Sequence, residues 1–304
     1  MTNFNRRTAI LSGLSIPFIN SLPALAASPM LGAQTTRFNR FKLGDFEVTA
    51  LLASTFIMPN AHGIFGTNVS DEEFAAVSAA AHIPTDKAKF FFTPTVVNTG
   101  RELVLFDTGQ NGASITSALK AAGYSPDQID VVVITHMHND HIGGMRHEGA
   151  ETFPNARYVT GAEEHNHWSF SGSEKFETHV VPVEDKIEYL EGEKPVVSGI
   201  TSIEAFGHTP GQMAYMIESQ GQQLVLIADV ANHYVWSLAY PDWEVRFDVD
   251  KAAAAATRRK VLGMLAADKI PFIGYHMPWP ALGYVEPRDS GFKYVPVSYQ
   301  MTME

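Results

Sequence analysis

The sequence predicts an α/β fold, and two observations carry that prediction. Apolar runs of strand length alternate with segments of helical pattern, and no linker or low-complexity run divides the chain. Three of the apolar runs lead into a residue that can bind metal: 203–206 before His208, 224–228 before Asp229 and 270–275 before His276. Such side chains at successive strand ends indicate a site on loops at one edge of a sheet.

Strands are expected where β-branched and aromatic residues stand between turn residues. Two connections have the composition of hairpin turns, Asn98-Thr99-Gly100 and Ser219-Gln220-Gly221. The predicted strands are 41–52, 94–99, 102–106, 130–134, 156–160, 201–206, 212–218, 223–228 and 270–275.

Helices are expected at 72–80, 113–122, 161–170 and 249–267. The tetrapeptide 125–128, Ser-Pro-Asp-Gln, predicts a short helical turn, because Pro suits the first position and Gln stands three residues after Ser. Asp248 or Asp250 can cap the Ala-rich helix that follows them.

A loop with the sequence THMHNDHIGG follows the apolar run 131–134. His136 and His138 are two residues apart, so in an extended loop they project the same way and can hold one ion. Asp140 and His141 then turn toward a second ion. Imidazole suits zinc, and a carboxylate suits a site that keeps water bound. A polar loop with incidental histidines is the weaker interpretation, because these groups would lose several kcal/mol if buried without partners.

A site for two ions needs more ligands than one loop offers, and the chain has 12 His. His208 lies in the sequence FGHTPG, whose Gly and Pro residues fix the backbone around it. Asp229 ends an apolar run and needs a cation or hydrogen-bond partners there. His276 ends another apolar run in the same way.

These motifs resemble the metallo-β-lactamase superfamily of dinuclear hydrolases. HMHNDH, GHTPG, Ile-Ala-Asp and a late His follow in the family's order, after an Asp-Thr-Gly that ends the run 103–106. The resemblance covers nearly all the chain after residue 38. It implies the fold of that family, an αββα four-layer sandwich.

The resemblance also implies a ligand set for two divalent transition-metal ions, with Zn²⁺ the first expectation. The first ion would take His136, His138 and His208, the second would take Asp140, His141 and His276, and Asp229 would bridge them. Asp107 would contact a ligand His and fix its tautomer. A turn-capping role for Asp107 before Gly109 is an equal alternative.

Further segments resemble one branch of the superfamily, that of methyl parathion hydrolase, which is related to the quorum-quenching lactonases. They are FKLGDFEVTA at 41–50, VNTG at 97–100, AAGY at 121–124, ESQGQ at 218–222 and GFKYVPVSY at 291–299. The branch implies an exported dizinc hydrolase of phosphotriesters, aryl esters or lactones.

The expected chemistry follows from two ions about 3.5–4 Å apart, which can share a water and lower its pKa, so that a metal-bridging hydroxide is the nucleophile. Asp140 and Asp229 are the catalytic candidates, because their carboxylates can steer the hydroxide proton. The expected partner is a small-molecule substrate. The sequence does not decide between a monomer and a homodimer.

The candidates for the substrate pocket are mostly aromatic and would suit an apolar, aromatic or acyl-bearing substrate. Trp168 and Phe170 end a predicted helix, and the branch resemblance places an aromatic residue at Trp168; a core position is the alternative. Trp279 follows His276 in a Pro-rich loop. His233 and Tyr234 follow Asp229 and could contact a substrate carbonyl, with ordinary cleft-wall residues as the alternative.

Competing functions meet specific objections. A thioester hydrolase of the glyoxalase II type has the same ligands but needs basic residues, which are few after His208. A flavodiiron protein normally has Glu where this chain has His138. β-Lactamases have either a Cys ligand or no bridging Asp, and the chain has no Cys. An exported metal-binding protein without catalytic activity stays open.

The amino-acid composition argues against some classes of binding partner and some classes of chemistry. The chain has 22 Lys and Arg against 33 Asp and Glu, a formal net charge of -11, which argues against a nucleic-acid partner. The RNA-processing members of the superfamily are the weaker alternative. Without Cys, the chain has neither thiol nucleophiles nor disulfides.

The first residues have the pattern of an export signal. Arg6 and Arg7 precede an apolar stretch, and 24–26, Ala-Leu-Ala, offers small residues for cleavage near Ala26. Adjacent arginines indicate twin-arginine export of a folded protein, with a general secretory signal as the alternative. Pro17 and Pro23 argue against a stable membrane span. We therefore expect residues 1–26 to be the signal, 27–304 to be one hydrolase domain, and the mature protein to be periplasmic or secreted.

Overall fold

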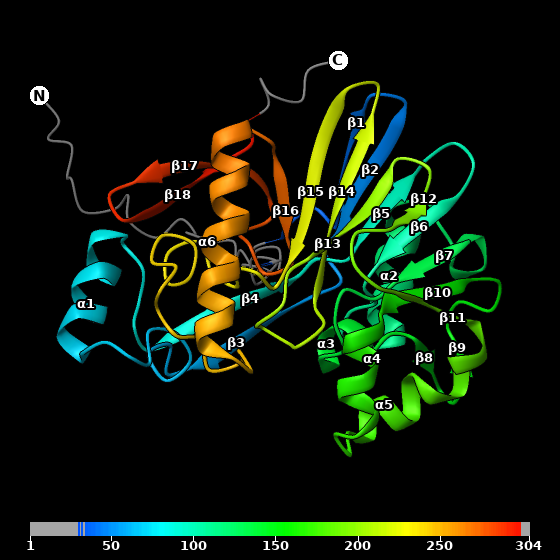
Figure 1. The fold of residues 1–304 in the computed structure, drawn as a ribbon, viewed down its shortest axis with the longest axis horizontal. Coiled ribbons are helices and arrows are strands. Elements are labelled where there is room, and N and C mark those ends of the chain that lie inside the picture. The colour runs from blue at the N-terminus through cyan, green and yellow to red at the C-terminus, as the bar shows by residue number, and fades with distance from the viewer. Residues whose placement is uncertain (1–29, 31, 33, 299–304) are drawn as a thin grey trace, which may run out of the picture. The chain divides into compact units, whose positions relative to one another are not determined.

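Two mixed sheets of seven strands each form the centre of the fold (Figure 1). The structure is a computed structural model that describes residues 30, 32 and 34–298. The predicted export signal, 1–26, lies outside the described residues. Residues 36–298 belong to one compact unit.

The first sheet has the order β1-β2-β5-β6-β7-β10-β11. β6, β7, β10 and β11 run parallel, and the other neighbours pair antiparallel. The strands are β1 (Phe38–Leu43), β2 (Phe46–Leu51), β5 (Thr95–Asn98), β6 (Leu103–Phe106), β7 (Val131–Val133), β10 (Arg157–Gly161) and β11 (Ile187–Leu190).

The second sheet has the order β12-β13-β14-β15-β16-β17-β18, in which only β15 and β16 pair in parallel. The strands are β12 (Pro195–Val197), β13 (Ile200–Glu204), β14 (Met213–Ser219), β15 (Gln222–Ala228), β16 (Phe272–Gly274), β17 (Leu282–Arg288) and β18 (Gly291–Pro296).

Helices cover the outer faces of the two sheets (Figure 1). α2 (Gly112–Ala121) buries Ile115 and Leu119 in one cluster with Leu105 and Val132 of the first sheet. α6 (Lys251–Asp268) buries Leu262 in the large cluster that also contains Leu224 and Phe272 of the second sheet. The layers are thus helix, sheet, sheet and helix, which confirms the predicted αββα architecture.

The remaining elements are short strands and helices outside the two large sheets. They are β3 (Ser54–Pro59), β4 (Lys87–Phe92), β8 (Arg146–His147), β9 (Ala150–Glu151), α1 (Asp71–Ala80), α3 (Asn139–Ile142), α4 (Ala162–Ser169), α5 (Glu174–His179) and the 3₁₀ segments Pro126–Gln128 and Val181–Lys186. Among the described residues, no helix combines the length and apolar character that crossing a bilayer requires.

Most predicted elements agree with the structure, and the differences have local causes. The predicted strand 41–52 is the hairpin β1–β2, because Gly44 takes a left-handed φ of 59° and turns the chain. The antiparallel pair β3 and β4 and the hairpin β17–β18 were not predicted, because Pro and charged residues interrupt their apolar pattern. Asp250 caps α6 by accepting a hydrogen bond from the Ala253 N–H, as expected.

Candidate metal centre

Seven histidine and aspartate side chains meet where strands of the two sheets end. The loop after β7 supplies His136 and His138, and the one-turn helix α3 follows with Asp140 and His141. The remaining three are the predicted residues of the second sheet's loops, His208 after β13, Asp229 after β15 and His276 after β16. Although these residues are far apart in the sequence, the structure brings all seven together.

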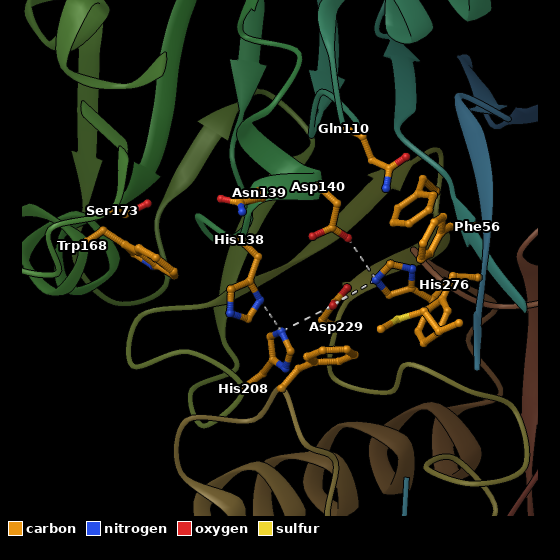
Figure 2. Close-up of a pocket in the computed structure, with 14 residues that line it drawn as sticks. Phe56, Gln110, His138, Asn139, Asp140, Trp168, Ser173, His208, Asp229 and His276 are labelled. Atoms are coloured by element: carbon orange, nitrogen blue, oxygen red, sulfur yellow. Dashed lines mark hydrogen bonds and ion pairs between the residues drawn. The ribbon is translucent and has the colours of Figure 1, made fainter. Parts of the chain in front are cut away.

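The ligand atoms form three overlapping groups, in each of which they lie within 4.8 Å of one another. One group is His136, His138 and His208; the second is Asp140, His141 and His276; the third is His136, His141 and Asp229. Figure 2 shows His138 and His208 on one side and Asp140 and His276 on the other, with Asp229 between them. The third group shares a member with each of the others, so the cluster has the geometry of two adjoining cation sites.

Hydrogen bonds outside the cluster fix the orientation of three imidazoles. Nδ1 of His141 lies 2.9 Å from Asp107 Oδ2, Nδ1 of His208 lies 2.8 Å from Asp248 Oδ1, and Nδ1 of His276 lies 2.8 Å from the Phe91 carbonyl. Carboxylate and carbonyl oxygens accept, so each Nδ1 donates. In the neutral ring, Nε2 then points into the cluster with a free lone pair, which is the arrangement of a metal-binding His.

The cluster contains polar atoms that the protein itself does not satisfy. His141 Nε2 and Asp229 Oδ1 are buried, lie 3.4 Å apart and make no hydrogen bond. His138 Nδ1 lies 3.1 Å from His136 Nε2 and 2.9 Å from His208 Nε2, yet a single N–H can serve only one of these nitrogens. Cations shared by these atoms would satisfy all of them. The donor set therefore fits two metal ions of the zinc type.

The histidine pKa values differ between the group of His136 and His138 and the group of His276. Burial lowers the pKa of His138 to about 3 and holds the pKa of His136 well below its usual range. Burial acts the same way on His276, but Asp229 and Asp140 outweigh it and raise the pKa of His276 to about 10. The carboxylates thus produce a strong negative potential beside His276, where a cation would be stabilised.

The backbone is in unusual conformations at two of these strand ends. Asp107 after β6 has φ of 59°, and Ala228 at the end of β15 has φ of 45°. Asp tolerates this left-handed region, whereas Ala rarely adopts it. The turn at Asp107 lets its carboxylate accept from the Thr135 N–H and face His141. The predicted contact between Asp107 and a ligand His is therefore present.

Two buried acids that hold the cluster were not recognised from the sequence. Asp248, read only as a helix cap, accepts from His208 Nδ1 and from the fully buried Arg258, whose NH2 lies 2.9 Å away. Glu164 accepts hydrogen bonds from both loops that carry His136, His138 and His208. In the sequence both acids look like ordinary residues of helix starts, so no local signal separates them from surface acids.

A cavity of about 560 Å³ opens over the cluster. His138, Asp140, His208, Asp229 and His276 lie on its floor (Figure 2). One wall is apolar and comes mainly from β3 and β4, with Phe56, Met58, Phe90, Phe92 and Phe247. Trp168 and the polar side chains Gln110, Asn139 and Ser173 complete the lining. None of the residues that the structure places around this cavity is Lys or Arg.

Only one of the predicted pocket residues lines this cavity. Trp168 does, with its ring centroid 5.6 Å from that of His138. Phe170 does not, because α4 ends at Ser169 and leaves this side chain 91% exposed. The other three predicted residues do not line it either: Trp279, His233 and Tyr234. They line a neighbouring cavity behind β4, and His276 is the one residue that lines both cavities.

Comparisons with known proteins agree with this geometry. A family model described as the Metallo-beta-lactamase superfamily matches residues 93–271. An N-acyl homoserine lactonase of Bacillus sp. is 26% identical over 161 residues, which are 53% of this chain and 61% of the lactonase. The chain thus spans less than two thirds of the length of the curated lactonases that it matches.

Two solved structures are similar over most of the chain. AidC, described as a dizinc quorum-quenching lactonase, is 26% identical with a TM-score of 0.80, and the match covers 86% of this chain and 98% of AidC. AbOPH, described as a hydrolase in the beta lactamase superfamily, is 24% identical with a TM-score of 0.81, covering 88% of this chain and 99% of AbOPH. The second likeness concerns the fold alone.

Proposed function

The chain belongs to the metallo-beta-lactamase superfamily, and we propose from this premise that it is a dinuclear-metal hydrolase of uncharged esters. The substrate class comprises lactones, aryl esters and phosphotriesters, with an acyl lactone as the first to test. The observation that carries the proposal is the pair of adjoining His and Asp groups on the floor of an apolar cavity. The similarity to AidC, a dizinc quorum-quenching lactonase, supports the choice of lactones.

We assign two zinc ions to the cluster. His136, His138 and His208 would hold one, Asp140, His141 and His276 would hold the other, and the carboxylate of Asp229 would contact both. Bound there, the ions would supply Lewis acidity and a water of lowered pKa. Asp107, Asp248 and the Phe91 carbonyl would keep three imidazoles in the tautomer that presents Nε2 to the ions.

The cavity residues determine which electrophile can approach. The phenylalanines of β3 and β4 offer an apolar surface for an acyl chain or aryl group. Gln110, Asn139 and Ser173 can hydrogen-bond a polar group of the substrate. The lining that the structure describes has no Lys or Arg, so it lacks the basic side chains that would bind the carboxylates of glutathione. This disfavours a glutathione thioester as the substrate.

A panel of substrates tests the proposal. Zinc-loaded protein should hydrolyse an N-acyl homoserine lactone, an aryl acetate or an aryl phosphotriester with a higher kcat/KM than a cephalosporin or a glutathione thioester. A cephalosporin or a glutathione thioester hydrolysed far faster than every ester, lactone and phosphotriester would contradict the assignment.

Trp168→Ala should raise KM for an aryl substrate about tenfold and change kcat by less than about threefold. A packing wall binds the ground state and the transition state alike, so its loss appears in KM. Steady-state kinetics measure both constants. Phe170→Ala is the control, because this neighbouring aromatic side chain is exposed outside the cavity and should have no effect. A kcat that falls a thousandfold at unchanged KM would show that Trp168 is not a binding wall.

We also propose that the protein is exported through its paired arginines. Replacing Arg6 and Arg7 together by Lys should leave the protein in the cytoplasm, because the folded-export route reads this pair. Fractionation of cells that express the full chain would measure this. Export at the normal level would indicate the general secretory route.

A further inference from the structure

Glu164 has a completely buried carboxylate whose two oxygens accept four hydrogen bonds. Oε1 accepts from the Met137 N–H at 2.8 Å and from Trp168 Nε1 at 2.6 Å. Oε2 accepts from Thr209 Oγ1 at 2.6 Å and from the Gly211 N–H at 3.1 Å. The exposed fraction of Glu164 is 0%, so these donors replace all of the water that the carboxylate loses.

The four donors come from three parts of the candidate site. Met137 stands between His136 and His138, and Thr209 follows His208 directly. These histidines make up one of the three groups, and they come from two different loops that meet only in the folded protein. The third part is Trp168, which lies one helical turn after Glu164 in α4 and lines the cavity beside His138.

The backbone around Glu164 is built for this close approach. A Cβ atom on Gly211 would lie 2.0 Å from the Glu164 backbone nitrogen. Only Gly therefore lets the loop that carries His208 approach the start of α4. The same contact accounts for the last Gly of the FGHTPG sequence. The loop that carries His208 is therefore packed directly on α4 and tied to it by the carboxylate.

The other half of the cluster has separate supports. His141 is held by Asp107, and Tyr275 donates its hydroxyl to the Asp140 carbonyl at 2.6 Å. His276 is held by the Phe91 carbonyl. None of these contacts involves Glu164, so a change at Glu164 should affect the two halves unequally.

We infer that Glu164 is a positioning residue for one ion of the pair. Its carboxylate sets the separation between the loop of His136 and His138 and the loop of His208, and it orients the Trp168 wall over the same ion. This inference rests on the proposed function, because it presupposes that the two groups each hold an ion.

Glu164→Gln is the direct test. The amide has the same shape but replaces one accepting oxygen with an NH₂ donor, which would face two donors of the protein. Metal-free full-length protein is titrated with Zn²⁺ in competition with a chromogenic chelator, and the two binding constants are compared with those of wild type. We expect one ion to bind about tenfold or more weakly and the other to stay within about threefold. Co²⁺ absorption would show the altered coordination of the weakened site.

Glu163→Gln is the matched control, because it makes the same substitution at the preceding, exposed position of the same helix. It should bind both ions like wild type. Thr209→Val removes a single donor to Glu164 and should weaken the same ion about tenfold, with the other ion again within about threefold. This variant keeps the test valid if Glu164→Gln does not fold.

The outcomes separate this inference from the proposed function. Equal weakening of both ions in Glu164→Gln, or no change in either, would overturn the positioning role while leaving the hydrolase intact. Thr209→Val with no selective effect would overturn it where Glu164→Gln cannot be purified. Wild-type protein that binds no Zn²⁺ would instead overturn the proposed function on which the inference rests.

Discussion

Replacing Asp229 by Asn should lower kcat/KM at least about a hundredfold and leave the protein folded. The carboxylate is almost completely buried, and its Oδ2 lies 3.2 Å from His276 Nε2 and 3.4 Å from His208 Nε2. It thus faces ligands of both proposed ions. An amide carries no charge and turns one oxygen into a donor, so it cannot contact two cations at once.

The fold should tolerate this change, because the contacts that Asp229 makes with protein donors are few. Asn232 Nδ2 donates to Oδ2 at 2.8 Å, and the remaining amide oxygen of Asn can still accept this bond. Circular dichroism and thermal unfolding of the metal-free protein provide the control, alongside the rate measurement. Near-wild-type turnover with two ions retained would show that Asp229 does not bridge them.

Asp248→Ala should destabilise the metal-free protein by about 3–5 kcal/mol, because it leaves a buried guanidinium without its counter-ion. Arg258 is only 1% exposed and donates NH2 to Asp248 Oδ2 at 2.9 Å, while its Nε donates to the Val230 carbonyl next to Asp229. The other oxygen of Asp248 accepts from His208 Nδ1. The same substitution should therefore also weaken metal binding about 10–100-fold, since His208 loses its orienting partner.

Urea unfolding of the chelator-treated protein measures the free energy of unfolding without the contribution of bound ions. The matched control is Asp242→Ala. Asp242 forms an ion pair with Arg259, which follows Arg258 in α6 and is exposed. Surface ion pairs contribute about 0–1 kcal/mol to stability. An Asp248→Ala protein no less stable than Asp242→Ala would mean that the buried pair contributes nothing to folding.

The seven clustered His and Asp residues could be predicted to lie together because each has a local signal in the sequence. A His or Asp that directly follows an apolar strand is rare without a reason, and Gly and Pro around His208 mark a loop of fixed shape. The resemblance of these motifs, in their order, to the metallo-β-lactamase superfamily then predicted the four layers. The strands before these residues could also be predicted, because the sequences of β7 and β15 are short, apolar and bounded by turn residues.

The supports of the site could not be predicted, because they depend on contacts between distant segments. Glu164 and Thr209 are 45 positions apart, and His208 and Asp248 are 40 apart. The cavity wall was not predicted for a related reason. β3 and β4 form a two-stranded sheet although α1 separates them in the chain, and their mixed apolar and charged pattern does not indicate a pair of strands. Phe170 shows the opposite error, since aromatic character alone does not indicate which way a helix end faces.

The metal content of the purified protein tests the central claim most directly. After expression with ample zinc, the full chain should carry close to two transition-metal ions per molecule by elemental analysis, because the cluster offers two adjoining groups of three ligands. Chelation should remove both ions together with the hydrolase activity, and Zn²⁺ should restore both. Less than half an ion per chain after metal-replete expression would contradict a dinuclear centre at this site.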